Sequence, residues 1–160
     1  METRIGIGYD SHRLVEGRKL FLGGVQIPYI KGLLSHSDGD CLIHAIADAL
    51  LGALAQGDIG ELFPDTDPQY KAIASAELLK KVLELVRKKG YTVSNVDTII
   101  IAEEPKLSLF KDQIKESLSR ILNIDNDRVG VKAKTNEGMG SLGRKEGIAA
   151  QAAVLIKKEG

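Results

Sequence analysis

The sequence predicts one α+β domain of two layers, in which a mixed sheet of about four strands carries helices on one face. Three observations favour this class. The chain has 160 residues, of which 43% are hydrophobic, and this suits one domain with one core. Strand and helix patterns are mixed without the strict alternation of a doubly wound sheet. No repeat or linker divides residues 1–160, so we expect a single domain.

The first part of the chain has the pattern of strands. Residues 4–10 alternate between apolar and small or polar residues, which is typical of a strand. Residues 20–22 and 25–27 flank Gly23-Gly24, and this arrangement predicts a hairpin or a bulge. The chain contains 17 glycines, many of them in clusters such as Gly6 and Gly8, and they either serve turns or let the backbone approach a ligand. We expect turns to explain most of them.

Three helices and three strands follow. Apolar residues at helical spacing predict a helix over 38–54, capped by Ser37 or Asp38, and 57–67 is a polar loop. The later elements are predicted as helix 75–88 with Ser75 as its cap and Gly90 as its stop, strand 96–102, helix 108–122, strand 129–133 and loop 138–143. Residues 148–156 are small and apolar and fit either a helix or a strand. We favour a strand because a glycine-rich loop precedes them.

Composition and charge argue against several classes of protein. Lys plus Arg and Asp plus Glu number 22 each, with no basic run of five or more, so we expect no nucleic-acid partner. No apolar run approaches about 18 residues, so we expect no membrane span. The first residues lack the layout of a secretory signal, and we expect a cytoplasmic protein. The single cysteine, Cys41, excludes an internal disulfide and fits a small core residue.

All three histidines lie between residues 12 and 44, among acidic residues. Asp10 and His12 are two apart at a strand end, so their side chains share a face, and His44 lies in the predicted helix. One carboxylate and two imidazoles form a ligand set for Zn²⁺ that leaves a fourth position open, as catalytic sites do. This spacing favours a metal centre over hydrogen-bonded surface histidines. Asp48, one turn after His44, either accepts the second N–H of a ligand histidine or is an exposed carboxylate.

Two further segments have phosphate-binding chemistry. His36 precedes the turn that opens the helix, and a helix start offers free N–H groups to a phosphate; a simple capped helix is the alternative. Residues 133–137 lead into a glycine-rich loop, where Thr135, loop N–H groups and Arg144 suit a phosphate, unless the loop is merely solvated. Glu137 among them indicates a second cation such as Mg²⁺. From these residues alone, the chain is a divalent-metal enzyme acting on phosphates.

Together these segments resemble the 2-C-methyl-D-erythritol 2,4-cyclodiphosphate synthase family over the whole chain. The motifs that carry the resemblance are Arg4-Ile5-Gly6-Ile7-Gly8-Tyr9-Asp10-Ser11-His12, Ser35-His36-Ser37-Asp38-Gly39-Asp40 with His44, Gly57-Asp58-Ile59-Gly60, Phe63-Pro64-Asp65-Thr66-Asp67-Pro68 and Gly143-Arg144. The resemblance implies an enzyme of non-mevalonate isoprenoid biosynthesis, a cyclising lyase. In that reaction the 2-phosphate of 4-diphosphocytidyl-2-C-methyl-D-erythritol 2-phosphate attacks the β-phosphorus of the same molecule and expels CMP. It also implies a homotrimer with sites between subunits.

The resemblance assigns roles to the matching residues. It implies Asp10, His12 and His44 as ligands of one zinc ion per subunit, and Glu137 as the residue that reaches a Mg²⁺ or Mn²⁺ ion brought with the substrate. It implies His36 and Thr135 as catalytic residues that steady the transition state. The implied substrate contacts are Asp10, Ser11, His12, His36, Ser37, Asp58, Ile59, Gly60, Phe63, Pro64, Asp65, Thr66, Asp67, Ala102, Glu103, Glu104, Pro105, Lys106, Leu107, Ser108, Lys134, Thr135, Asn136, Glu137, Ser141 and Arg144. Among these, residues 102–108 match the cytidine pocket.

The chain departs from the family pattern at two places. Lys134 and Asn136 flank Thr135 where relatives often have further threonines, and Ser141 stands where some have Phe near the trimer's central cavity. The nucleophile in the implied reaction is a phosphate oxygen already ionised near neutral pH, which agrees with the lack of a Ser–His or Cys–His pairing. Two other functions stay open: a zinc phosphohydrolase whose metal activates water, and a non-catalytic trimer that zinc only stabilises. The open fourth ligand position argues against the second.

Overall fold

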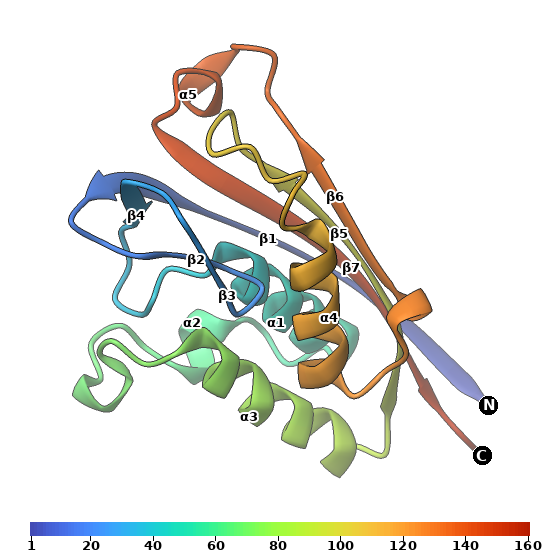
Figure 1. Cartoon of the computed structure of the whole chain (residues 1–160). Helices are drawn as coiled ribbons and strands as arrows, with labels where there is room; N and C mark the ends of the chain where they lie inside the picture. Colours follow the sequence, from blue (N-terminus) through green and yellow to red (C-terminus); the bar gives the residue numbers. More distant parts are fainter.

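The computed structural model describes all 160 residues and is built on a five-stranded mixed sheet (Figure 1). The strands lie in the order β4 (Lys31–Leu33), β1 (Glu2–Glu16), β7 (Gly147–Lys158), β5 (Thr92–Ile101) and β6 (Val129–Lys134). Only β5 and β6 are parallel, and all other neighbours are antiparallel. The α+β class and the mixed sheet are confirmed. The expected count of four strands is wrong by one, because β4 is too short to show an alternating pattern.

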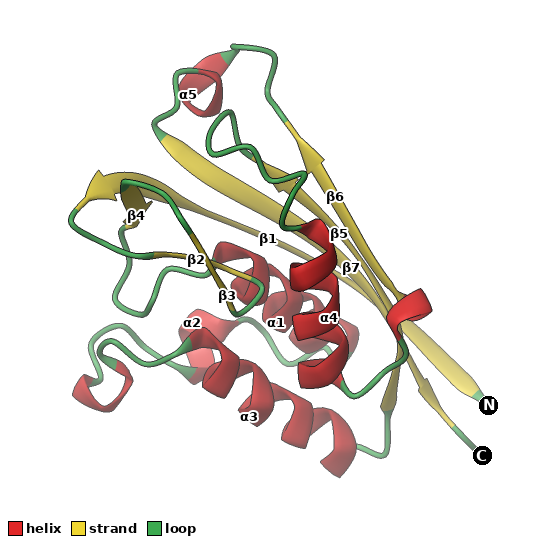
Figure 2. Ribbon diagram, viewed as in Figure 1, coloured by secondary structure: helices red, strands yellow, loops and turns green.

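The helices form a second layer on one face of the sheet (Figure 2). Helix α1 (Cys41–Ala53) lies against β1 and β7, α3 (Ser75–Lys88) packs on α1, and α4 (Lys111–Leu122) packs on β6. Short helical turns occupy the connections, namely α2 (Ile59–Leu62), η1 (Pro68–Tyr70), η2 (Asn126–Arg128) and α5 (Gly140–Gly143). A separate hairpin of β2 (Leu20–Leu22) and β3 (Val25–Ile27) confirms the turn at Gly23-Gly24. None of the helices combines the length and apolar character that a membrane crossing requires.

Most predicted elements are present with shifted ends. β1 is longer than the predicted 4–10 because its pairing with β7 continues from Glu2 to Arg13. The ambiguous segment 148–156 lies in β7 and is therefore a strand. The predicted polar loops at 57–67 and 138–143 each contain a short helix, which their glycines concealed. The expected cap at Ser75 is wrong, since Ser75 is the first residue of α3 and its side chain makes no cap bond.

Asp40 caps α1, so the expected cap at Ser37 or Asp38 is wrong. The Asp40 carboxylate is fully buried and accepts the N–H of Ile43 at 3.1 Å. It also accepts the two N–H groups of Gly23-Gly24, at 2.9 and 2.7 Å, and thereby joins the helix to the hairpin. Burial raises the pKa of Asp40, and these N–H donors oppose the rise. One carboxylate thus fixes both the start of α1 and the hairpin.

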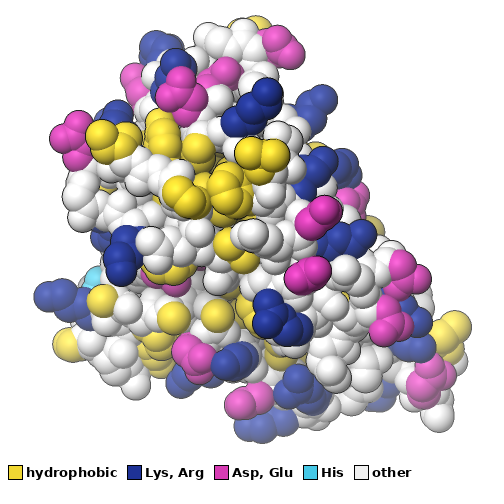
Figure 3. Space-filling model, in the orientation of Figure 1, with side chains coloured by type: hydrophobic (Ala, Val, Ile, Leu, Met, Phe, Trp, Pro, Cys, Tyr) yellow, Lys and Arg dark blue, Asp and Glu magenta, His cyan; other side chains and the backbone are white.

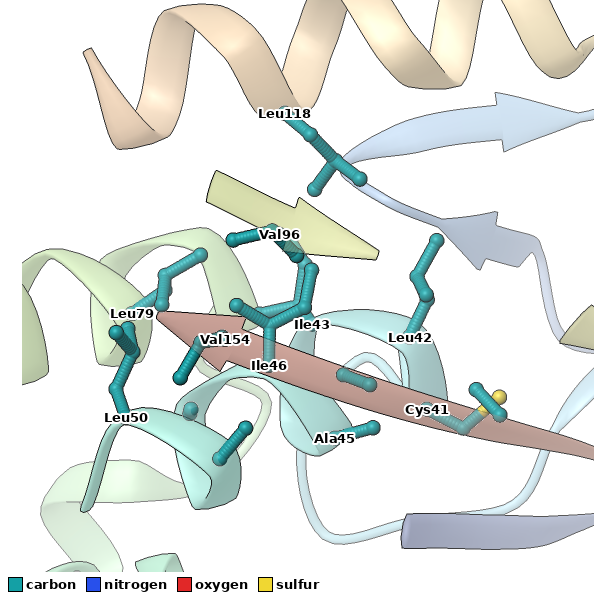
Figure 4. Packing of buried hydrophobic residues seen from close by; sticks show 14 of the residues in the cluster. Cys41, Leu42, Ile43, Ala45, Ile46, Leu50, Leu79, Val96, Leu118 and Val154 are labelled. Carbon is teal, nitrogen blue, oxygen red and sulfur yellow. The ribbon is translucent and has the colours of Figure 1, made fainter. Parts of the chain in front are cut away.

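The core lies between α1 and the sheet and is aliphatic (Figure 4). Figure 4 shows Cys41 beside the leucine and isoleucine side chains of α1, and its complete burial confirms it as a small core residue. Gly6 and Gly8 let α1 approach β1, because a Cβ on either would overlap the carbonyl oxygen of Ala49 or Ala45. These two glycines therefore serve helix packing, which is neither a turn nor an approach to a ligand.

The opposite face of the sheet carries apolar side chains that this chain leaves open. Ile5, Ile7 and Tyr9 of β1 are 71%, 78% and 55% exposed. A cavity of about 470 Å³ lies beside them, lined by residues of β1, β5 and β7. Charged side chains of both signs are interspersed over the face seen in Figure 3, in keeping with the balanced composition. Exposed apolar clusters of this kind mark contact surfaces in soluble proteins.

Candidate metal centre

Asp10 and His12 on β1 and His44 on α1 bring three ligand atoms together. His12 Nε2 lies 3.2 Å from His44 Nδ1, and these two nitrogens lie 2.7 and 3.0 Å from Asp10 Oδ2. Ligands at about 2.0 Å from a tetrahedral zinc ion are about 3.3 Å from one another. The observed triangle therefore has nearly the dimensions of one face of such a tetrahedron. The expected convergence of these three residues is confirmed, and the donor set fits a divalent metal.

The local sequence explains this convergence. Alternation along β1 places Asp10 and His12 on the same face as Gly6 and Gly8, and that face meets α1. Because Gly8 lies against the backbone of Ala45, the preceding residue, His44, faces Asp10 and His12. These two residues lie inside β1 and not at a strand end as expected, because the pairing with β7 continues past them. The glycines that permit close packing thus also set the distance between the ligands.

The triad is electrostatically coupled. Burial opposes ionisation of Asp10, but its hydrogen bonds to His12 and His44 outweigh burial and lower the pKa of Asp10. Burial likewise favours a neutral His44, yet the hydrogen bond to Asp10 and the charge of that carboxylate raise the pKa of His44. Without a metal, the site therefore retains a proton between these groups more readily than an isolated imidazole does.

The second ring nitrogen of His44 faces two hydroxyl groups and not a carboxylate. His44 Nε2 lies 2.8 Å from Ser75 Oγ and 3.2 Å from Ser37 Oγ. Asp48 was expected either to accept the second N–H of a ligand histidine or to be exposed, and both expectations are wrong. It is half-buried, and its carboxylate accepts the N–H of Ile59 at 2.8 Å. Asp48 therefore anchors the start of α2. The role of Ser75 escaped prediction because a serine at a helix start has the pattern of a cap.

A cavity of about 220 Å³ opens beside the triad. It gathers many of the expected substrate contacts, namely Asp10, His12, His36, Ser37, Ile59, Gly60, Phe63 and Asp65. Four unpredicted residues also line it: Ser35, Tyr70, Ile73 and Leu78. The last three are apolar or aromatic and offered no chemical signal in the sequence. His36 Nε2 is buried and has no hydrogen-bond partner within the chain, so it is available to a bound ligand.

The remaining expected residues of the loop serve its own structure. Asp58 caps α2 by accepting the N–H of Glu61 at 3.0 Å, and Asp67 caps η1 by accepting the N–H of Gln69 at 3.0 Å. Pro64 and Thr66 lie between these two caps and do not line the cavity.

A second cavity, of about 200 Å³, forms from the predicted cytidine segment and the end of β6. Its lining is Ala102, Glu103, Pro105, Lys106, Leu107, Ser108, Ala133, Lys134 and Thr135. Glu104 is not part of it: its hydrogen bonds to Lys145 (2.7 Å) and to the Tyr29 hydroxyl (3.2 Å) lower the pKa of Glu104. Glu103 Oε1 accepts the N–H groups of Asn136 and Gly138, which ties this segment to the next loop.

The loop after β6 is held by its own polar groups. Glu137 has a left-handed backbone (φ 52°) and donates its N–H to Thr135 Oγ1 at 3.2 Å. The side-chain amide of Asn136 donates to the Met139 carbonyl at 2.8 Å, so this departure from the family pattern supports the loop. Arg144 is exposed and pairs with Glu146 at 3.2 Å.

Within one chain, the two residues expected to be catalytic are not brought together. His36 lines the cavity of the triad, and Thr135 lines the second cavity. Ser11 and Ser141 line a third cavity, of about 210 Å³, which shares His12 with the first. The predicted residues thus fall into separate recesses of one chain.

Comparison with known proteins gives one consistent result. Residues 3–157 match the model of the YgbB family. The chain is 54% identical to a 2-C-methyl-D-erythritol 2,4-cyclodiphosphate synthase of Carboxydothermus hydrogenoformans, over 99% of this chain and 97% of that protein. It is 57% identical to a protein of the same name from Geobacter metallireducens, over 97% and 99%.

Solved structures agree with this result. A 2C-methyl-D-erythritol-2,4-cyclodiphosphate synthase in its CDP-bound form superposes with a TM-score of 0.90 at 42% identity, over 96% of this chain and 100% of that one. The CDP complex of IspF from Plasmodium falciparum has a TM-score of 0.86 at 41% identity, over 99% and 97%. The bifunctional IspDF of Campylobacter jejuni has a TM-score of 0.94 at 45% identity, and the match covers 99% of this chain but 43% of that one.

Proposed function

The chain belongs to the YgbB family of 2-C-methyl-D-erythritol 2,4-cyclodiphosphate synthases, and we propose that the cavity beside the metal centre carries out that family's reaction. The substrate is 4-diphosphocytidyl-2-C-methyl-D-erythritol 2-phosphate. An oxygen of its 2-phosphate forms a bond to the β-phosphorus, the bond from that phosphorus to the bridging oxygen of CMP breaks, and CMP leaves with the electron pair. The products are the cyclic diphosphate and CMP.

The convergence of Asp10, His12 and His44 is the observation that carries this proposal. The reaction must bring two anionic phosphates together, and two unit charges about 4 Å apart repel by roughly 4 kcal/mol at an effective dielectric constant near 20. A site without cationic help would not allow this approach. We assign zinc to the triad and Mg²⁺ or Mn²⁺ to Glu137. When bound, these ions offset the phosphate charge and polarise phosphoryl oxygens.

The chain's own residues bind and orient the substrate. His36 offers its unpartnered Nε2 to a phosphate oxygen, and Ser37 and the backbone at Gly60 complete the wall of the same cavity. Phe63 and Ile73 provide an apolar side that limits access of water. Fixing the geometry of an intramolecular attack contributes about 7–11 kcal/mol to such reactions. These residues therefore act mainly by positioning, and none of them needs to act as a strong base.

The second cavity supplies the other half of the site. Lys106, Lys134 and Thr135 provide two cations and a hydroxyl there, which suit the cytidine diphosphate end of the substrate. Because His36 and Thr135 line separate recesses of one chain, we assign each complete site to two neighbouring copies in a homotrimer. The uncovered apolar face of β1 supports this assembly, since association would bury Ile5, Ile7 and Tyr9.

Phosphorus NMR of the reaction mixture tests the proposed function. Incubation of the zinc- and magnesium-loaded protein with the substrate is expected to give a cyclic diphosphate and CMP. A zinc phosphohydrolase would instead give linear products or inorganic phosphate. A non-catalytic trimer would leave the substrate intact while zinc raises the melting temperature. Either of these outcomes would overturn the proposal.

A further inference from the structure

Ser75 lies directly behind the metal centre, on the side of His44 that faces away from the other two ligands. It is the first residue of α3 and is completely buried. Its hydroxyl donates to Asp38 Oδ1, and its backbone N–H donates to Asp38 Oδ2 at 2.9 Å. Its Oγ lies 2.8 Å from His44 Nε2. Two bonds to one carboxylate therefore fix the hydroxyl group against the imidazole.

The Asp38 carboxylate determines where the protons of the Ser75 hydroxyl and the His44 ring lie. A carboxylate has no proton to give, so the single hydroxyl proton of Ser75 is used on Asp38. The Ser75 oxygen is then left to accept a hydrogen bond, and its nearest donor is His44 Nε2 at 2.8 Å, well inside the 3.5 Å to the Ser37 hydroxyl. A neutral His44 with its proton on Nε2 has its lone pair on Nδ1, the atom that faces Asp10 and His12. Metal binding requires that form of the ring.

Ser37 does not provide the same constraint. Its Oγ is farther from His44 Nε2, at 3.2 Å, and it accepts the N–H of Gly39 at 3.2 Å. No carboxylate bonds the Ser37 hydroxyl, so the direction of its proton is not determined. The α3 helix itself gains no side-chain cap from Ser75, because its cap position is Ala74 and makes no such bond. Of the two serines, only Ser75 therefore presents a hydroxyl of fixed direction to His44, and its side chain serves this contact and not the cap of α3.

We propose that Ser75, backed by Asp38, is a positioning residue of the metal centre that holds His44 in the tautomer and ring orientation required for a metal at Nδ1. The inference rests on the proposed zinc site. Hydrogen-bond partners behind a metal-bound imidazole raise its basicity and fix its direction, and their loss lowers metal affinity by about 10- to 100-fold. Ser75 touches no substrate in this scheme and acts through His44.

The first test compares zinc affinity in two serine variants, measured by competition with a chromophoric chelator. Ser75→Ala is expected to bind zinc about 10- to 100-fold more weakly than the wild type. Ser117→Ala is the matched control, because Ser117 is also a buried serine whose hydroxyl donates one hydrogen bond, to the Gly23 carbonyl at 2.6 Å. It lies on α4, and its removal is expected to leave zinc affinity unchanged. A Ser75→Ala variant with wild-type zinc affinity would overturn the inference.

The second test needs no variant and stands even if Ser75→Ala does not fold. The chain has three histidines, so nitrogen-15 NMR of labelled imidazoles can resolve each ring. In the zinc-loaded wild type, where Nδ1 holds the metal and the Asp10 carboxylate cannot compete for a proton there, His44 is expected to carry its proton on Nε2, and that proton should exchange slowly with water because Ser75 accepts it. A proton on Nδ1 under these conditions would contradict the inference.

The two tests separate this inference from the proposed function. If wild type and Ser75→Ala bind zinc equally well, the role of Ser75 is refuted and the metal centre stands. If the wild type binds no zinc, the proposed metal centre is refuted, and the inference about Ser75 falls with it.

Discussion

His12 Nε2 and His44 Nδ1 lie 3.2 Å apart, although 32 residues separate them in the chain. The contact joins the interior of β1 to the first turn of α1, and a glycine in the strand allows the two backbones to approach. Both nitrogens face the same Asp10 oxygen.

Zinc affinity should rise with pH over the range in which His44 loses its proton. Burial lowers the pKa of His44, but the Asp10 carboxylate outweighs burial and raises that pKa above the ordinary imidazole value of about 6.5. Zinc must displace the proton, so affinity should continue to increase above pH 6.5 and become constant once His44 is neutral. Calorimetry in two buffers of different ionisation enthalpy should show proton release that diminishes as pH rises. Affinity independent of pH would contradict this prediction.

The metal-free protein should lose stability over the same pH range. A raised pKa of His44 means that the folded state holds the proton more tightly than the unfolded state. This contribution is complete below the unfolded pKa and is lost as pH rises through the folded pKa. Urea denaturation of the metal-free wild type and of His44→Ala at several pH values measures it. The free energy of unfolding of the wild type should fall as pH rises, and that of His44→Ala should change less. An equal pH dependence in both proteins would refute the coupling of His44 to Asp10.

Gly8→Ala should destabilise the fold by about 3–5 kcal/mol, at the upper end of single-substitution effects. The added Cβ would overlap the backbone carbonyl of Ala45, which no rotamer change relieves. Gly52→Ala is the control, because its Cβ would meet nothing closer than the Ile7 carbonyl at 3.7 Å, and alanine in a helix is more favourable than glycine by up to about 1 kcal/mol. Urea denaturation measures both variants. Equal stabilities would contradict the packing role of Gly8.

Asp40→Asn should destabilise the fold by about 1–3 kcal/mol, because an amide group would face buried N–H donors that the carboxylate now satisfies. Asp67→Asn is the comparison: Asp67 also caps a helical turn, but it does so at the surface. Its effect is expected to be below about 0.5 kcal/mol. Chemical denaturation measures the free energy of unfolding of both variants. Equal losses of stability would show that Asp40 does not join the hairpin to α1.

Ile7→Glu should dissociate the proposed trimer without unfolding the chain. Ile7 is 78% exposed in the single chain, so a glutamate there is tolerated by the monomer but placed at the proposed contact face. Sedimentation velocity should give a trimer for the wild type and for Lys88→Glu, which places the same charge on the helical side. It should give a folded 17.3 kDa species for Ile7→Glu. A wild type that sediments as a monomer would exclude the shared site.

The pattern of the sequence is sufficient for the class of fold and for the three residues that converge at the candidate metal centre. Helical periodicity locates α1 and α3, and the two-residue spacing of Asp10 and His12 predicts correctly that both share one face of the strand. Local signals of this kind depend on neighbouring residues alone. The three-residue strand β4 carries no such signal and was missed, and the cap of α1 was misplaced because three acidic or hydroxyl residues compete there.

The tertiary partners of polar residues were less accessible from the sequence. Asp48 and Ser75 both stand at helical positions that suit a simple local role, but their actual partners, Ile59 and His44, are fixed by how α1, α2 and α3 pack. The open apolar face of β1 was equally hidden, since alternation predicts a strand without telling which face is covered. Expected contacts such as Asp58, Asp67 and Glu104 hold the chain's own loops in this structure.

The zinc content of two histidine variants tests the central claim most directly. His44→Ala removes a proposed ligand, whereas His36→Ala removes a histidine that lines the same cavity but lies outside the triad. Atomic absorption of purified protein, measured beside turnover, is expected to find zinc in the wild type and in His36→Ala and none in His44→Ala, with turnover lost in both variants. A His44→Ala protein that keeps its zinc and its turnover would contradict the account.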